Sequence, residues 1–174
     1  MLIGLDKDIR EFIDTLEKQN RVLDNLLQLE EAKRQLIILG QVEELNKLVQ
    51  KQGIIVSNLE KLEDARFKSQ LKLARRWEIT VEELPASMIL TKVKEARHES
   101  SGELQAAIEK LEHSLSSLKA ANAENNGLVK QSLDYIDTLQ SLLTGDVAGT
   151  YSDRGTQVDK STTRPALRII DKKA

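Results

Sequence analysis

Two histidines are the residues best suited to chemistry in this chain, and their surroundings offer them few partners. His98 follows Glu95 at the Glu-x-x-His spacing that helical di-iron proteins use, while His113 stands apart from any such motif. A di-iron site needs two of these motifs and two further glutamates facing a four-helix core, whereas this chain supplies one motif at the edge of a predicted helix. The chain has no cysteine to pair with either histidine as a nucleophile. We therefore expect no metal site and interpret His98 as a solvated residue at the start of a helix.

Other sequence patterns that accompany catalysis are also missing. The chain contains no phosphate-binding glycine loop, no nucleophile elbow and no dinucleotide fingerprint. Arg75, Arg76 and Trp77 permit two interpretations, a cationic aromatic patch for a partner or a helix end. The helix end is favoured, because the arginines would complement the helix dipole while Trp77 covers the end of the bundle. The sequence thus predicts a protein that is not an enzyme and uses no cofactor.

Composition and charge narrow the class of protein further. The 174 residues include 26 Lys and Arg against 28 Asp and Glu, a net charge of -2, which leaves no basic surplus to bind phosphates or anionic lipids. The lack of cysteine fits a reducing compartment, and no apolar run approaches the roughly 18 residues of a membrane span. We expect a cytoplasmic protein that binds no nucleic acid and does not insert into a membrane.

The elements that position these residues are predicted to be helices throughout. Apolar residues recur every three or four positions in three stretches, which predicts helices over about residues 5–39, 41–75 and 97–144. Gly40 separates the first two, and an antiparallel hairpin is favoured over a kink because it lets the two apolar stripes bury each other. Residues 77–95 form a connector in which Thr80 and Glu83 match a capping box that would open a short helix. The predicted fold is all-α, an elongated antiparallel bundle or coiled-coil-like rod of three long helices.

The third predicted helix has the strictest repeat and would be about 70 Å long. Its stripe positions alternate steps of four and three from Leu104 to Leu143, and Asn122, Asn125 and Ser132 interrupt them with polar side chains. We interpret these polar positions as ones that fix the helix register, or as the place where the partner helices end.

The last third of this helix is more apolar than a core-facing surface requires. From Leu104 to Leu118 the apolar stripe spans roughly 100°, but it widens to roughly 180° where Leu128, Tyr135 and Leu142, one heptad apart, join it. Either more helix of the same chain packs there, for which few residues remain, or the face binds another chain. A second copy of this chain would explain the pattern as well as a foreign helix.

Residues 145–174 differ in character from the 144 residues before them. Glycine, proline, serine, threonine and charged residues leave too little apolar surface to offset chain ordering, which predicts a disordered tail after a helical domain of residues 1–144. Tyr151 and the run at 166–170 are apolar islands in this tail. Such islands often become ordered on a partner.

The sequence around the wide apolar face resembles a known family. Residues 122–145, NAENNGLVKQSLDYIDTLQSLLTG, and residues 150–155, TYSDRG, resemble the C-terminal signature of the FlgN family of bacterial flagellar export chaperones. The signature combines an asparagine-rich step, a helix with paired leucines that ends in Leu-Thr-Gly, and a Tyr-x-x-x-Gly motif in a flexible tail. Family members commonly carry glycine directly after the tyrosine, where this chain has Ser152.

This resemblance implies a helical chaperone that binds the C-terminal helical segments of the hook-filament junction proteins FlgK and FlgL and keeps them unassembled. It further implies delivery of these subunits to FlhA, the export gate protein of the flagellar type III apparatus. By the same resemblance, Leu128, Tyr135, Leu139 and Leu142 contact the substrate, and Tyr151 contacts the gate. The alternative is a structural coiled-coil protein whose wide face forms a homodimer, and a homodimer of the free chaperone also stays open.

Overall fold

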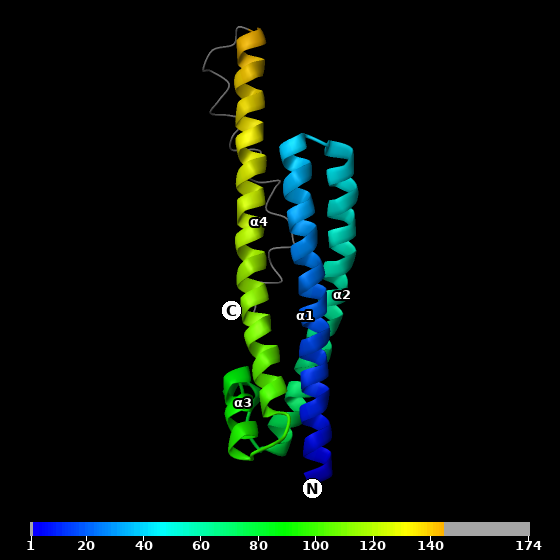
Figure 1. Ribbon diagram of the computed structural model, residues 1–174, viewed down its shortest axis with the longest axis vertical. Coiled ribbons are helices and arrows are strands. Elements are labelled where there is room, and N and C mark those ends of the chain that lie inside the picture. Colours follow the sequence, from blue (N-terminus) through cyan, green and yellow to red (C-terminus); the bar gives the residue numbers. More distant parts are fainter. Residues whose placement is uncertain (1, 145–174) are drawn as a thin grey trace.

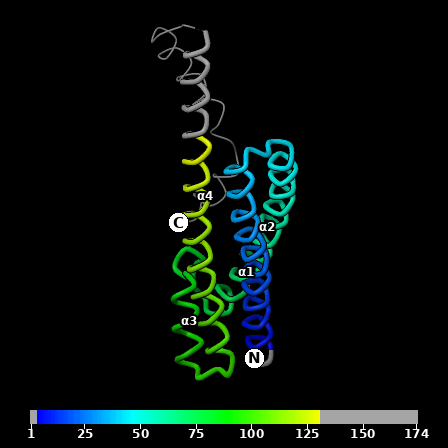
Figure 2. Tube along the Cα trace, turned by 45° about the horizontal axis from the view of Figure 1, so that its top comes forward, coloured from blue at the N-terminus to red at the C-terminus, as the bar shows by residue number. Residues whose placement is uncertain are grey.

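The computed structural model describes the backbone of residues 2–144 and the side chains of residues 4–130. Over this part the protein is helical, which confirms the predicted all-α class. The elements are α1 (Leu2–Leu39), α2 (Val42–Arg76), the 3-10 helix η1 (Val81–Glu83), α3 (Ala86–Glu95) and α4 (Ser101–Thr144). In Figures 1 and 2, α1 and α2 lie side by side, and α3 lies at the end of the molecule opposite the turn that joins them.

The turn between α1 and α2 forms a tight antiparallel hairpin (Figure 1). Gly40 has a φ of 66°, a left-handed conformation that glycine adopts without a Cβ clash. The backbone N–H groups of Gly40 and Gln41 donate to the carbonyls of Ile37 and Leu36 at 3.2 and 3.0 Å. This pair of bonds is the Schellman motif, which satisfies the last carbonyls of a helix and ends it. Gly40 therefore produces the hairpin rather than a kink.

The long helix α4 lies alongside α1 and runs in the same direction. Asn20 Nδ2 donates to the carbonyl of Ala107 at 3.0 Å, and farther along both helices Asn125 Nδ2 donates to the carbonyl of Glu30 at 2.9 Å. Both residue numbers increase together from the first pair to the second, so α1 and α4 point the same way. This direction requires the connector to turn the chain around at the end opposite Gly40.

The connector differs from the sequence prediction in two places. Thr80 precedes η1 without a side-chain cap bond, and only its carbonyl accepts the Glu83 N–H at 3.2 Å, so the predicted capping box is wrong. α3 begins after Pro85 instead, whose ring presets the backbone for entry into a helix. α4 begins at Ser101 and not near residue 97, because Arg97 has a φ of 51° and leaves the helical region.

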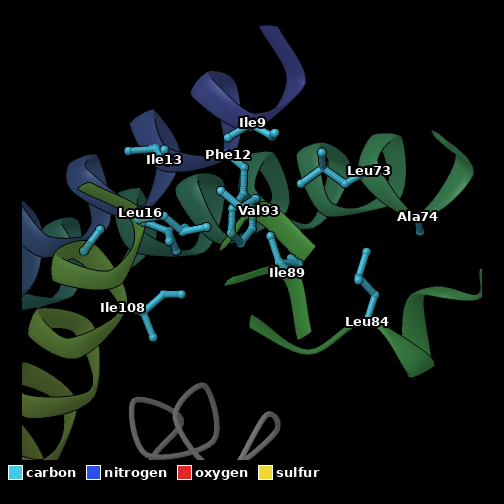
Figure 3. Close-up of a cluster of buried hydrophobic side chains, with 12 residues drawn as sticks. Ile9, Phe12, Ile13, Leu16, Leu73, Ala74, Leu84, Ile89, Val93 and Ile108 are labelled. Carbon is cyan, nitrogen blue, oxygen red and sulfur yellow. The ribbon is translucent and has the colours of Figure 1, made fainter. Parts of the chain in front are cut away.

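Most of the core lies at the connector end, where four helices converge. Figure 3 shows this cluster, in which side chains from α1, α2, α3 and α4 and from the segment before α3 meet. Its buried members are Ile9, Phe12, Ile13, Leu16, Leu73, Ala74, Leu84, Ile89, Val93, Leu104, Ala107 and Ile108. A smaller buried cluster of Leu23, Leu26 and Leu118 lies nearer the Gly40 turn. The hydrophobic core thus becomes thinner from the connector end toward the turn.

Trp77 and the two arginines before it form a helix end, as the favoured interpretation had it. α2 ends at Arg76, and Trp77 is partly buried against the main core cluster. Arg76 pairs with Asp8 of α1, and the Lys92 ammonium of α3 lies 5.6 Å from the centre of the Trp77 ring. These contacts hold α1, α2 and α3 together. The indole of Trp77 contacts the core and Lys92 of the same chain.

Candidate functional site

His98 lies between helices and not at a solvated helix start, so that expectation is wrong. Its side chain is 17% exposed, its Nε2 lies 2.9 Å from the Asp6 carboxylate, and its Nδ1 accepts the Ser100 N–H at 3.1 Å. Arg10 bonds the same carboxylate at 3.2 Å and also pairs with Glu99. The hydrogen bond to Asp6, its charge and then the charge of Glu99 raise the pKa of Arg10 above its ordinary value. These groups tie the start of α1 to the turn before α4.

The described part of the chain contains no group of side chains placed to hold a metal ion and no helix that could cross a membrane. Within that part, no group of three or more His, Cys, Asp or Glu side chains is placed to hold a metal ion. Glu95 is the last residue of α3 and His98 follows in the turn, so the Glu-x-x-His spacing does not lie on one helix. No helix among the described residues is long and apolar enough to cross a membrane.

A buried polar layer joins the three long helices below the Gly40 turn. Glu30 is 6% exposed and Asn125 is 2% exposed. Asn125 Nδ2 donates to the Glu30 carboxylate at 2.6 Å, and Gln52 Nε2 donates to its other oxygen at 2.8 Å. A buried carboxylate is costly unless it is hydrogen-bonded, and here donors from α2 and α4 meet it. Only one alignment of the helices brings these donors together, so the structure supports the interpretation of Asn125 as a residue that fixes the register.

Beyond this polar layer Val129 continues the apolar stripe of α4 without equivalent cover. Val129 follows Leu111 by 18 residues, which is about five turns, so both lie on the same side of α4. Leu111 packs against both core clusters, whereas Val129 is 36% exposed. Figure 1 shows α4 running on past the Gly40 turn toward Thr144. The partner helices end before α4 does, which was the second interpretation of its polar positions.

The structure places the predicted site residues unevenly. Leu128 lies on α4 next to Val129 and is half-buried. Tyr135, Leu139 and Leu142 lie at positions within α4, but their side chains are outside the described part of the chain. Tyr151 lies outside the described residues altogether. The grouping of these side chains into one surface therefore stays a prediction.

The sequence analysis did not predict two features of the site. Glu30 belongs to the heptad series that runs through Leu16, Leu23 and Ile37, so its place on an apolar stripe was the available signal of burial. The hairpin tip also carries apolar side chains that are largely exposed: Ile38, Val42 and Val49, at 59%, 65% and 46%. The seven-residue spacing of Val42 and Val49 is the sequence pattern that could have indicated this apolar surface.

The described residues form an elongated helical protein, a hairpin packed against a long third helix whose apolar stripe is exposed at Val129. Comparison with protein families gives a match to the FlgN family, described as FlgN protein, over residues 1–159. The chain belongs to the FlgN family. This is a family of chaperones rather than enzymes, and membership indicates a role as a flagellar export chaperone. No curated protein and no solved structure gives a significant match.

Proposed function

We propose that this protein is a cytoplasmic chaperone for the hook-filament junction proteins FlgK and FlgL. It binds their C-terminal amphipathic helices, prevents premature assembly, and delivers them to the export gate protein FlhA. Membership of the FlgN family supports the chaperone role. The observation that carries the substrate site is the exposure of Val129, a core-stripe residue of α4 that is 36% exposed above the last polar layer.

The part of α4 beyond Asn125 is long enough to bind a helix. From the residue after Asn125 to Thr144 it has about 19 residues, which at 1.5 Å each give about 28 Å of helix. An amphipathic helix laid along this length buries apolar surface on both partners, at roughly 25 cal/mol per Å², less the cost of ordering the bound segment. We assign Leu128, Tyr135, Leu139 and Leu142 to this contact. Leu128, Tyr135 and Leu142 widen the apolar face, and Leu139 belongs to the stripe that they join.

Covering an amphipathic helix also explains why binding would prevent assembly. An exposed apolar stripe is a surface that associates with other proteins, so a chaperone that occupies it would keep the subunit soluble and unassembled. We assign Tyr151 to the later contact with FlhA. Capture and delivery would then rest on adjacent elements that mutation can separate.

A pull-down from an extract of flagellated cells tests this proposal. Full-length protein on a resin should retain FlgK and FlgL, and native mass spectrometry of the eluted material should show one chaperone with one junction protein. Retention of neither protein would contradict the proposal. A stable homodimer that excludes both would favour the structural coiled-coil alternative.

A further inference from the structure

We infer that the hairpin tip is a second wall of the substrate site, so that the bound amphipathic helix inserts between the tip and α4 as a fourth helix of the bundle. This inference rests on the proposed function. The surface concerned, called the open seam below, consists of Ile38, Val42 and Val49 on the hairpin and Val129 on α4. Their exposed fractions are 59%, 65%, 46% and 36%.

Ile38 lies on the side of α1 that faces α4. It follows Asn20 by 18 residues, or about five turns, so the two side chains leave α1 in the same direction. Asn20 donates to the Ala107 carbonyl of α4, which fixes that direction. An isoleucine that faces a neighbouring helix would ordinarily be buried, and Ile38 is 59% exposed.

Val42 and Val49 lie on the side of α2 that, at Val56, packs against the smaller core cluster. They precede Val56 by two heptads and one heptad, so the three valines occupy one flank of the helix. Val56 packs against the smaller core cluster, which includes Leu118 of α4. The flank therefore continues the side of α2 that packs against this cluster, and it becomes exposed as it approaches the Gly40 turn.

Val129 completes the seam on the opposite side. One turn before Ile38, Arg34 Nη1 lies 3.8 Å from the Glu124 carboxylate, which brings these parts of α1 and α4 to the same level. Val129 is little more than one turn beyond Glu124. Ile38 and Val129 thus lie on facing sides at neighbouring levels, yet each keeps a large exposed fraction. The seam is closed at the polar layer and open above it.

The chemistry of the open seam fits an apolar helix. Singly scattered exposed apolar residues are ordinary, but these four lie on the three long helices and continue the helix sides that pack in the core. Among the charged residues near them, Arg34 pairs with Glu124 and Lys47 pairs with Glu44. Binding of export substrates is general to the FlgN family, so the occupant to which we commit is the amphipathic helix of the junction protein. It would continue the α1–α4 interface where the chain's own side chains stop filling it.

Cysteine protection tests this placement directly, because the natural chain has no cysteine. Full-length Val42→Cys and Val49→Cys variants would be alkylated with and without saturating purified FlgK, and the modification followed by the mass of the chaperone. We expect FlgK to slow alkylation at both positions by at least about tenfold.

Ile54→Cys is the matched control. Ile54 lies on the same helix and is 67% exposed, and it follows Gln52 by about 200° of helical rotation. Since Gln52 bonds to Glu30 in the core, Ile54 points away from the seam. Its alkylation rate should change by less than about twofold.

The outcomes separate this inference from the proposed function. If FlgK binds and the rates at Val42 and Val49 do not change, the inference is wrong and the proposed function stands. If wild-type protein does not bind FlgK, both fail. Protection that increases with chaperone concentration alone would identify a second copy as the occupant. Faster alkylation of the free chain after removal of residues 146–174 would identify the tail as the occupant, and either result overturns the inference.

Discussion

At the scale of single residues, two glycines of the hairpin have opposite effects. Gly40 occupies a left-handed conformation with a φ of 66° and ends α1, whereas Gly53 lies inside α2. A Cβ at either position would meet no atom within 4 Å, so only backbone conformation distinguishes them. The same substitution therefore isolates the contribution of the backbone at each site.

Alanine at these two positions should shift stability in opposite directions. We predict that Gly40→Ala lowers the free energy of unfolding by about 1 to 2 kcal/mol, because the left-handed conformation strains an L-residue. Gly53→Ala should raise it by up to about 1 kcal/mol, because alanine favours the helix interior. Urea denaturation measures both, and changes of the same sign would contradict this account of the turn.

Asn125 fixes the register of α4 against α1 through its hydrogen bonds to Glu30. Asn125→Ala removes a donor from the buried Glu30 carboxylate and should cost about 1 to 3 kcal/mol of unfolding free energy. The neighbouring Asn126 is exposed, so Asn126→Ala should change the same quantity by less than about 0.5 kcal/mol. Equal effects of the two substitutions in urea denaturation would show that the polar layer contributes no specific stability.

At the scale of the elements, local sequence patterns predicted the helices but not every boundary. The stripes and Gly40 carry their information within a few residues, so the hairpin followed from them. The start of α4 depends on the conformation of Arg97, and the short helix α3 begins at Pro85 without a capping box. Those features depend on how the connector closes over the core, which short-range propensity does not encode.

The candidate site was predictable only in part, for a similar reason. The widening of the apolar face at Leu128 is a pattern along one helix, and it pointed to α4. The partner of Asn125 is Glu30, 95 residues earlier, and nothing in either local sequence specifies that pairing. The facing positions of Ile38 and Val129 likewise require the alignment of α1 with α4.

The two ends of the α4 stripe should differ in their contribution to stability. Leu104 is fully buried at the connector end, and Leu104→Ala should cost about 2 to 5 kcal/mol of unfolding free energy. Val129→Ala, at the open end of the same stripe, should cost less than about 0.5 kcal/mol. Similar losses at both positions in thermal and urea denaturation would mean that another part of the chain covers Val129.

At the scale of the whole molecule, the stable and the open parts lie at opposite ends. Four helices pack at the connector end, and the core narrows to a polar layer below the Gly40 turn. A partner that binds at the open end would therefore cover existing apolar surface without unfolding the main core. This arrangement suits a protein that holds another chain and later releases it.

Tyr151 should affect delivery but not capture. It lies in a stretch too polar to form a core, and a tyrosine ring enters an apolar pocket while its hydroxyl keeps a hydrogen bond. We predict that Tyr151→Ala weakens binding to the cytoplasmic domain of FlhA by at least about tenfold, or about 1.4 kcal/mol. Affinity for FlgK should stay within about twofold. In calorimetric titrations, equal losses for both partners would place Tyr151 in the substrate site, and no loss for either would remove its assigned role.

The central claim is that the part of α4 beyond Asn125 binds the junction protein. Calorimetric titration of FlgK into two forms of the full-length chaperone tests it most directly. Wild-type protein should bind with one-to-one stoichiometry, and the triple variant Leu128→Ser, Leu139→Ser and Leu142→Ser should lose at least about 100-fold in affinity, or about 2.7 kcal/mol. The variant should keep the wild-type helix content and melting temperature, and Ile54→Ser should bind like wild type. Wild-type affinity in a folded triple variant would contradict the claim.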